Sequence, residues 1–185
     1  VIASPRNEAE LRNLMHTAAA YDGPFAIRYP RGKGEGISAD GAPRILEIGR
    51  GEKLREGSDI VFISTGPIAA EVRKAIEQLE AEGIDAAHYD MKFVKPLDTT
   101  LLREAAAKGV AIITVEDGSA VADFLIQEGY GRLPIKKIGV GDRFIAQGSV
   151  AELRRLCGMD SQSIAAAAKE FVAEKQFQTE TSVDK

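Results

Sequence analysis

The feature that most constrains the fold is a regular alternation of apolar runs and amphipathic segments between residues 44 and 175. The apolar runs are rich in β-branched residues, as in "DIVFIST" and "VAIITVED". We expect strands at 60–65, 84–90, 110–116 and 134–139. Segments such as "IAAEVRKAIEQLEAEG" lie between them, with apolar residues recurring at a helical period. Strands joined by helical crossovers predict a mostly parallel sheet with helices on both faces.

The composition is that of a globular protein, with 185 residues, 44% apolar and 28% charged. A net charge of −4 gives no global field for nucleic acid or an anionic membrane, so we expect neither as a partner. No apolar run reaches the ~18 residues of a membrane span, and no signal peptide opens the chain. Cys157, the single cysteine, excludes an internal disulfide and is expected to be a buried residue near a helix end. These features favour a cytoplasmic protein.

Residues 1–43 follow a different pattern. "SPRNEAELRNLMHTAAAYDG" predicts a helix with Ser4 as its N-cap and Pro5 at its first position. "PFAIRYP" predicts a short strand, and the glycines of residues 32–43 predict a linker. Because the chain begins without methionine and runs straight into a helix signal, we expect a piece of a longer protein. Residues 176–185 are polar and are expected to be a frayed tail.

The glycines of "FAIRYPRGKGEG" do not match a nucleotide-binding loop. A P-loop needs Gly-x4-Gly-Lys-Ser/Thr before a helix, whereas Lys33 is followed by Gly34 and more linker. Arg28 is the stronger candidate, because a guanidinium at a strand end suits bidentate recognition of phosphate or carboxylate. The alternative for Arg28 is a structural ion pair with a nearby acidic residue. Arg31 is expected to be solvated or to hold the linker.

The other polar candidates have structural interpretations. His16 and His88 have no second ligand at metal-binding spacing, which favours structural roles for both. Lys92 is expected at a surface edge. Glu116 and Asp117 follow a predicted strand, at the sheet edge where open α/β folds place ligands. They suit acid–base chemistry or a metal, but without a partner base or nucleophile, capping of the next helix is favoured. The residues alone therefore indicate a fold and no self-contained active site.

Several segments together resemble the carboxyl-terminal part of the 1-deoxy-D-xylulose-5-phosphate synthases, a thiamine-dependent, transketolase-like family. The segments are "AIRYPRG", "LREGSDIVFISTG", "DMKFVKPLD", "IITVED" and "IGVGDRFIAQGSVAEL". The similarity runs from residue 1 to about residue 172. "LREGSDI" and "PLD" also occur in transketolases and in the E1 β subunits of 2-oxoacid dehydrogenases, which remain an alternative.

The resemblance implies a transferase that condenses pyruvate, with loss of CO2, and glyceraldehyde 3-phosphate in isoprenoid (terpenoid) and thiamine biosynthesis. It implies thiamine diphosphate and Mg²⁺ as cofactors, with their ligands outside this chain, because the family's Gly-Asp-Gly motif is absent. It also implies a five-stranded, three-layer α/β/α domain over residues 44–175, with an antiparallel first strand. By the same resemblance, residues 1–31 end the pyrimidine-binding domain and residues 32–43 form the linker. The family also implies a homodimer.

Arg28 matches the family's arginine that binds the phosphate of the aldehyde, and Arg31 is a weaker match. The chain departs from the family pattern at Gly141 and Gln147, and it lacks a glycine-rich stretch between Gly118 and Ser119. We therefore expect a fragment that is not catalytic alone. Its expected partners are the rest of the polypeptide and small-molecule substrates. The alternative of another class is a noncatalytic dimerisation or docking module.

Overall fold

The computed structural model describes residues 1–31, 34–37, 41–116 and 120–183. The strands are β1 (Ile2–Ala3), β2 (Ala26–Ile27), β3 (Glu52–Arg55), β4 (Ile60–Ser64), β5 (Ala86–Asp90), β6 (Phe93–Lys95), β7 (Ala111–Val115) and β8 (Ile135–Ile138). The α-helices are α1 (Glu8–Ala20), α2 (Ala69–Ala81), α3 (Thr99–Ala107), α4 (Ala120–Leu125), α5 (Val150–Leu156) and α6 (Ser161–Val183). A 3-10 turn (Gly66–Ile68) precedes α2, and a π-helical turn (Ile126–Tyr130) follows α4.

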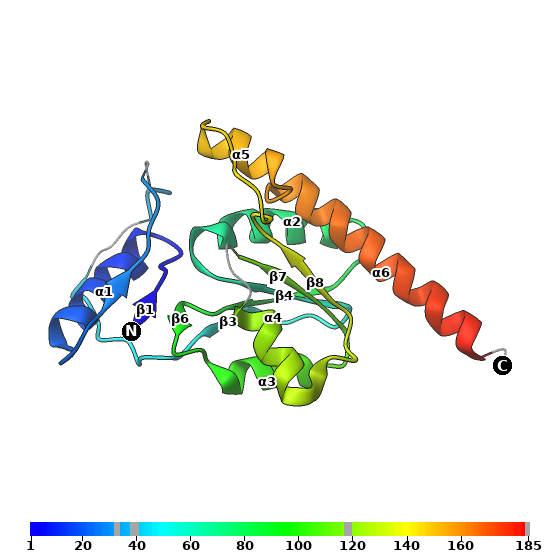
Figure 1. The fold of residues 1–185 in the computed structure, drawn as a ribbon, viewed down its shortest axis with the longest axis horizontal. Coiled ribbons are helices and arrows are strands. Elements are labelled where there is room, and N and C mark those ends of the chain that lie inside the picture. The colour runs from blue at the N-terminus through cyan, green and yellow to red at the C-terminus, as the bar shows by residue number, and fades with distance from the viewer. Residues whose placement is uncertain (32–33, 38–40, 117–119, 184–185) are drawn as a thin grey trace.

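The larger sheet has the strand order β3-β5-β4-β7-β8 (Figure 1). β4 runs parallel to β5 and β7, and β7 runs parallel to β8. β3 is antiparallel to β5. The four predicted strands all form within their predicted ranges, and the mostly parallel five-stranded sheet with an antiparallel first strand is confirmed.

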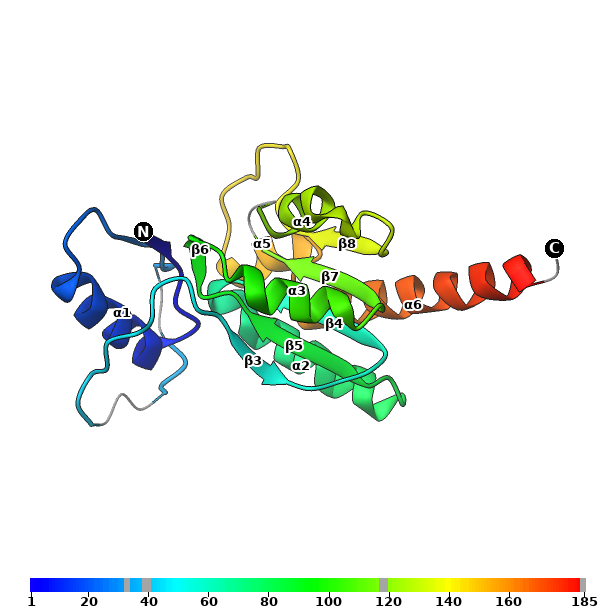
Figure 2. The ribbon, with the colours of Figure 1, turned by 90° about the horizontal axis from the view of Figure 1, so that it is seen from below.

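Helices cover both faces of this sheet (Figure 2). Along β4, Ile60 and Phe62 pack in the cluster with α2 and α6, whereas Val61 and Ile63 pack in the cluster with α3 and α4. All four side chains are at most 1% exposed, because neighbouring residues of a strand point to opposite faces and both faces are covered. The result is the predicted three-layer α/β/α arrangement.

The amino-terminal segment lies to one side of this domain and is joined to it by a second sheet, β2-β1-β6 (Figure 1). β6 follows β5 of the large sheet and pairs antiparallel with β1. Ala3, Leu14 and Phe93 form a small buried core beneath α1. Strands far apart in the chain therefore hold the two parts together.

The predicted start of the first helix is wrong. The N-cap is Asn7, whose side-chain Oδ1 accepts a hydrogen bond from the Glu10 N–H at 3.0 Å. Ser4 follows the last residue of β1, and its N–H donates to the Lys92 carbonyl at 2.9 Å. This sheet-like bond keeps Ser4 extended, so the helix begins one turn later.

Other helix ends agree with the local sequence. Asp98 caps α3 by accepting from the Leu101 N–H at 2.9 Å. Ser149 and Glu152 form the expected capping box at α5. Cys157 lies at the end of α5 as expected, but it is only partly buried against the core. The tail expected to fray instead continues α6 as far as Val183.

Candidate functional site

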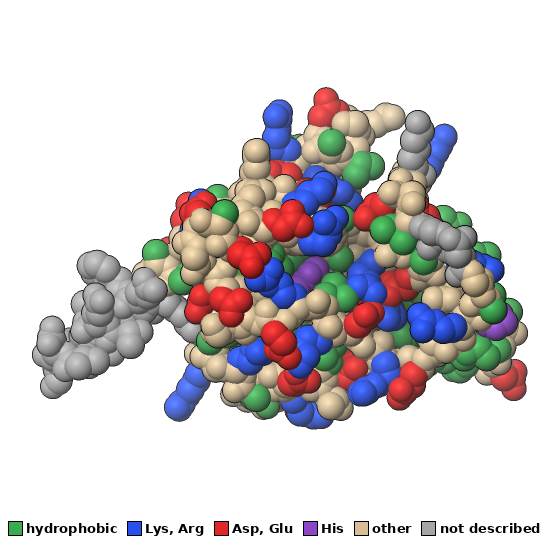
Figure 3. Space-filling model, turned by 180° about the vertical axis from the view of Figure 1, so that it is seen from behind, with side chains coloured by type: hydrophobic (Ala, Val, Ile, Leu, Met, Phe, Trp, Pro, Cys, Tyr) green, Lys and Arg blue, Asp and Glu red, His purple; other side chains and the backbone are tan. Residues whose placement is uncertain are grey.

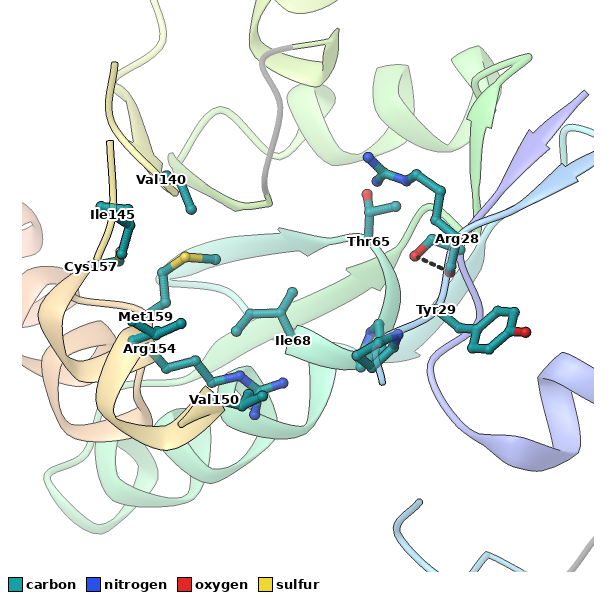
Figure 4. Close-up of a pocket in the computed structure, with 14 residues that line it drawn as sticks. Arg28, Tyr29, Thr65, Ile68, Val140, Ile145, Val150, Arg154, Cys157 and Met159 are labelled. Carbon is teal, nitrogen blue, oxygen red and sulfur yellow. Dashed lines mark hydrogen bonds between the residues drawn. The ribbon is translucent and has the colours of Figure 1, made fainter. Parts of the chain in front are cut away.

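A cavity of about 540 Å³ opens between the amino-terminal segment and the carboxyl end of β4 (Figure 4). One side carries Arg28 and Tyr29 from the end of β2, and the floor carries Thr65 from the turn after β4. The remaining wall is mainly apolar and comes largely from the β8–α5 loop and α5: Ile68, Val140, Ile145, Val150, Leu153 and Met159. Open α/β sheets place ligands at this edge.

Arg28 is the candidate anion ligand that the structure places in this cavity. Its side chain is exposed and extends toward Thr65 (Figure 4). Its backbone N–H donates to the Ala3 carbonyl at 2.8 Å, which anchors the strand end. Arg28 forms no ion pair with any residue that the structure describes. The alternative role, a structural ion pair with an acidic residue, is therefore not seen among the described residues.

A second guanidinium in the cavity was not identified from the sequence. Arg154 Nη1 lies 3.3 Å from Glu71 Oε1, and Glu71 also accepts from the backbone N–H of Ser161 at 3.1 Å. The Arg154 charge is therefore compensated by a residue 83 positions away, a contact that no local pattern indicates. The cavity has one paired and one unpaired arginine among its described residues, and the unpaired one is Arg28.

Arg31 lies in a different place from Arg28. It is exposed and lines a neighbouring cavity of about 720 Å³. That cavity also carries Glu8, Glu35 and Glu71, so its basic residues face carboxylates. The structure therefore does not bring Arg31 into the cavity with Arg28.

The charged side chains of the chain are of both signs, 24 Lys and Arg against 28 Asp and Glu. Figure 3 shows acidic and basic side chains interspersed over one face of the molecule. Such a mixture produces little long-range field of either sign. Recognition of an anion by this chain therefore depends on a local cation.

A partly buried cluster of ionisable groups lies at the junction of the two sheets. Lys92, expected at the surface, is only 9% exposed, and that expectation is wrong. Its positive φ of 56° belongs to the bend between β5 and β6, where its ammonium lies 3.1 Å from Glu10 and 3.3 Å from Glu52. Arg6 Nε lies 3.0 Å from the fully buried Asp90. Five ionisable groups thus connect the amino-terminal segment to the large sheet.

Burial changes the protonation of two groups in this region. Burial, aided by the Glu10 charge, raises the pKa of Asp90 to about 8, against the opposing effect of Arg6 and Lys92. Burial and the nearby Arg6 charge lower the pKa of His88 to about 4. His88 is buried, and its Nε2 lies 2.8 Å from the Ser64 hydroxyl oxygen, so the structural role predicted for it has a hydrogen-bond partner. His16 is exposed on α1.

Replacing Asp90 by asparagine is expected to remove a loss of stability between pH 6.5 and 8. The folded protein retains the Asp90 proton up to about pH 8, whereas an unfolded Asp releases it near pH 4, so stability falls as pH rises between these values. The depressed pKa of His88 acts oppositely, but only between pH 4 and 6.5. Above pH 6.5 the fall in the free energy of unfolding is therefore due to Asp90. Its slope is at most ~1.4 kcal/mol per pH unit.

Urea unfolding at pH 6.5, 7.25 and 8 measures this effect. Asp123→Asn, on an exposed residue of α4, is the matched control and should keep the decline of the unmodified protein. A decline of unchanged steepness in Asp90→Asn would show that this carboxyl does not control the pH dependence.

Of the two remaining acidic candidates, the structure describes Glu116 alone. Glu116 is buried at the end of β7, where its N–H donates to the Ile138 carbonyl at 3.1 Å, and Asp117 lies outside the described residues. The predicted helix-capping role therefore stays a prediction. Within the described ranges, no group of three His, Cys, Asp or Glu residues could hold a metal ion. No helix in that same part of the chain has the length and apolar character to cross a membrane.

Comparison with known proteins assigns the chain and its fold to a family. Residues 49–164 match the family described as "Transketolase, C-terminal domain", and the chain belongs to this family. A solved structure titled "Split gene transketolase, inactive beta4 tetramer" superposes with a TM-score of 0.80 at 34% identity, over 93% of this chain and 57% of that one. A transketolase mutant from Pichia stipitis, at 20% identity and a TM-score of 0.67, covers 95% of this chain and 25% of its own, and shows the same fold.

The curated relatives that match this chain carry the name of one particular enzyme. The 1-deoxy-D-xylulose-5-phosphate synthase of Parabacteroides distasonis is 54% identical over 173 residues, and that of Porphyromonas gingivalis is 51% identical over 172. Each match covers 89% of this chain and 27% of the relative. The resemblance predicted from the sequence is confirmed, and the chain spans about a quarter of the length of the relatives it matches.

Proposed function

We propose that this chain is the carboxyl-terminal part of an enzyme that joins pyruvate, with loss of CO2, to glyceraldehyde 3-phosphate, forming 1-deoxy-D-xylulose 5-phosphate. The observation that carries the proposal is the identity of 46–54% to relatives that bear this one name. Because the chain corresponds to 27% of their length, it does not catalyse alone. The product would supply isoprenoid and thiamine biosynthesis in a cytoplasmic setting.

Arg28 is proposed to bind the phosphate of the aldehyde. Three features support this role: its position beside the carboxyl end of β4, its extension into the cavity, and its lack of an ion pair with the described residues. A guanidinium makes charge-assisted hydrogen bonds to phosphate oxygens, and such bonds are about twice as strong as neutral ones. Arg31 remains a second candidate, in the neighbouring cavity.

Thiamine diphosphate and Mg²⁺ are proposed to bind the rest of the same polypeptide. Bound thiamine diphosphate supplies the nucleophilic carbon of this chemistry. The described residues of this chain do not fit the Mg²⁺, since no three of their His, Cys, Asp or Glu side chains lie close enough together to bind a metal ion. The proposed partners are the rest of the chain, in a homodimer, and the two small substrates.

A noncatalytic assembly module is the second candidate. It is favoured by one observation, the likeness to a structure whose title names an inactive β4 tetramer. Assays of the whole polypeptide and of residues 1–185 alone, each with pyruvate and glyceraldehyde 3-phosphate, separate the two. The proposal expects turnover only by the whole polypeptide, whereas a whole polypeptide without activity would favour the module.

Arg28→Ala in the whole polypeptide is expected to raise the KM for glyceraldehyde 3-phosphate about 10- to 100-fold, as for a lost hydrogen bond to a charged group. The KM for pyruvate should change little, because Arg28 is assigned to the acceptor. Arg31→Ala is the matched control and should have a smaller effect. Steady-state kinetics with each substrate varied in turn compare both variants with the unmodified polypeptide, and an unchanged acceptor KM in Arg28→Ala would refute the assignment.

A further inference from the structure

We infer that Ser4 is a positioning residue that holds Arg28 over the cavity. The inference rests on the proposed phosphate-binding role of Arg28. Ser4 follows β1 and lines the same cavity. It is polar, yet only 5% of it is exposed. A buried hydroxyl is expected to be committed to a specific hydrogen bond. In this fold that bond is made to Arg28.

Both backbone polar groups of Arg28 are held by two consecutive residues. Its N–H donates to the Ala3 carbonyl at 2.8 Å, and its carbonyl accepts from the Ser4 hydroxyl at 3.2 Å, the dashed line beside Arg28 in Figure 4. The second bond lies beyond the last residue of β2, where the regular ladder with β1 has ended. The Ser4 side chain therefore replaces a ladder bond at the residue that carries the guanidinium.

Ser4 is itself fixed from two other directions. Its backbone N–H donates to the Lys92 carbonyl at 2.9 Å, at the bend between β5 and β6. Gly66, in the turn after β4, has a φ of +79°, and a Cβ there would lie 2.3 Å from the Ser4 hydroxyl oxygen. Only a glycine permits this close approach of the turn. The hydroxyl is thus packed against the turn that carries Thr65, on the cavity floor.

These contacts set the position of Arg28 relative to the large sheet. The Arg28 side chain is exposed, and no ion pair within the described part of the chain orients it. The position of its backbone therefore determines the point from which the guanidinium reaches into the cavity. Loss of the Ser4 hydroxyl frees the Arg28 carbonyl while leaving the Ala3 bond in place. The end of β2 then becomes more mobile, and we expect weaker binding of the acceptor aldehyde.

The test uses the whole polypeptide with Ser4→Ala, Ser4→Thr, Arg28→Ala and the double variant Ser4→Ala/Arg28→Ala. Ser4→Ala should raise the KM for glyceraldehyde 3-phosphate about 2- to 10-fold, the effect of one neutral hydrogen bond, with kcat and the pyruvate KM unchanged. Ser4→Thr retains the hydroxyl and should restore the acceptor KM. The double variant should resemble Arg28→Ala, because Ser4 acts through Arg28.

The outcomes separate this inference from the function on which it rests. An Arg28→Ala variant without effect overturns the proposed function and the inference together. An affected Arg28→Ala with an unaffected Ser4→Ala overturns the inference alone. So does a Ser4→Ala defect that adds fully to that of Arg28→Ala, or one that Ser4→Thr does not relieve. If Ser4→Ala does not fold, Ser4→Cys, a weaker donor of similar size, must show the same selective rise in acceptor KM.

Discussion

Replacing Gly57 by alanine is expected to lower the free energy of unfolding by about 3 kcal/mol, the upper part of the range for overpacking. A Cβ at Gly57 would lie 2.2 Å from the carbonyl carbon of Ala86 and 2.3 Å from the backbone nitrogen of Ala87. These atoms belong to β5, which pairs with β3 on one side and β4 on the other. The clash is with a paired backbone, which cannot move aside as a flexible side chain can.

Gly131→Ala is the matched control for this prediction. It makes the same chemical change at a residue with a helical φ of −62°, and its Cβ would meet no atom within 4 Å. We expect a change within about 0.5 kcal/mol, as for an unconstrained surface position. Urea unfolding midpoints of the two variants measure the difference. Equal midpoints would mean that the β3–β4 connection is not packed against β5 as described.

Much of the large domain was predictable because its signals are local. "DIVFIST" and "VAIITVED" are apolar on both sides, and β4 and β7 are indeed buried on both faces. Asp98 and Ser149 cap helices within three residues of themselves, so their roles depend only on neighbouring sequence. Short-range patterns of this kind are sufficient to predict the elements and the class of fold.

The junction between the two parts was not predictable in the same way. Lys92 beside a strand favours a surface position, whereas the structure buries it with Glu10, 82 residues earlier, and Glu52. β1 has two residues, too few for a periodic signal. The strand predicted at "PFAIRYP" forms as β2, but its pairing with β1 was not predicted. Both features depend on contacts between distant segments.

The candidate site also combines features that local sequence indicates with features that depend on distant contacts. The strand-end position of Arg28 indicated either an anion ligand or a structural ion pair, and only the family match favoured phosphate binding. The cavity beside it could not be predicted, because its apolar wall comes largely from residues 140–159, in a loop and helix that fold back toward β2. The pairing of Arg154 with Glu71 is likewise a tertiary contact, and it distinguishes the two arginines of the cavity.

The choice of acceptor tests the central claim, that Arg28 binds a phosphate, most directly. We would measure kcat/KM in the whole polypeptide for glyceraldehyde 3-phosphate and for glyceraldehyde, which lacks the phosphate. Binding through Arg28 predicts that Arg28→Ala lowers kcat/KM about 10- to 100-fold for the phosphorylated aldehyde and leaves it nearly unchanged for the other. An equal fall for both aldehydes, or no fall for either, would contradict phosphate binding by Arg28.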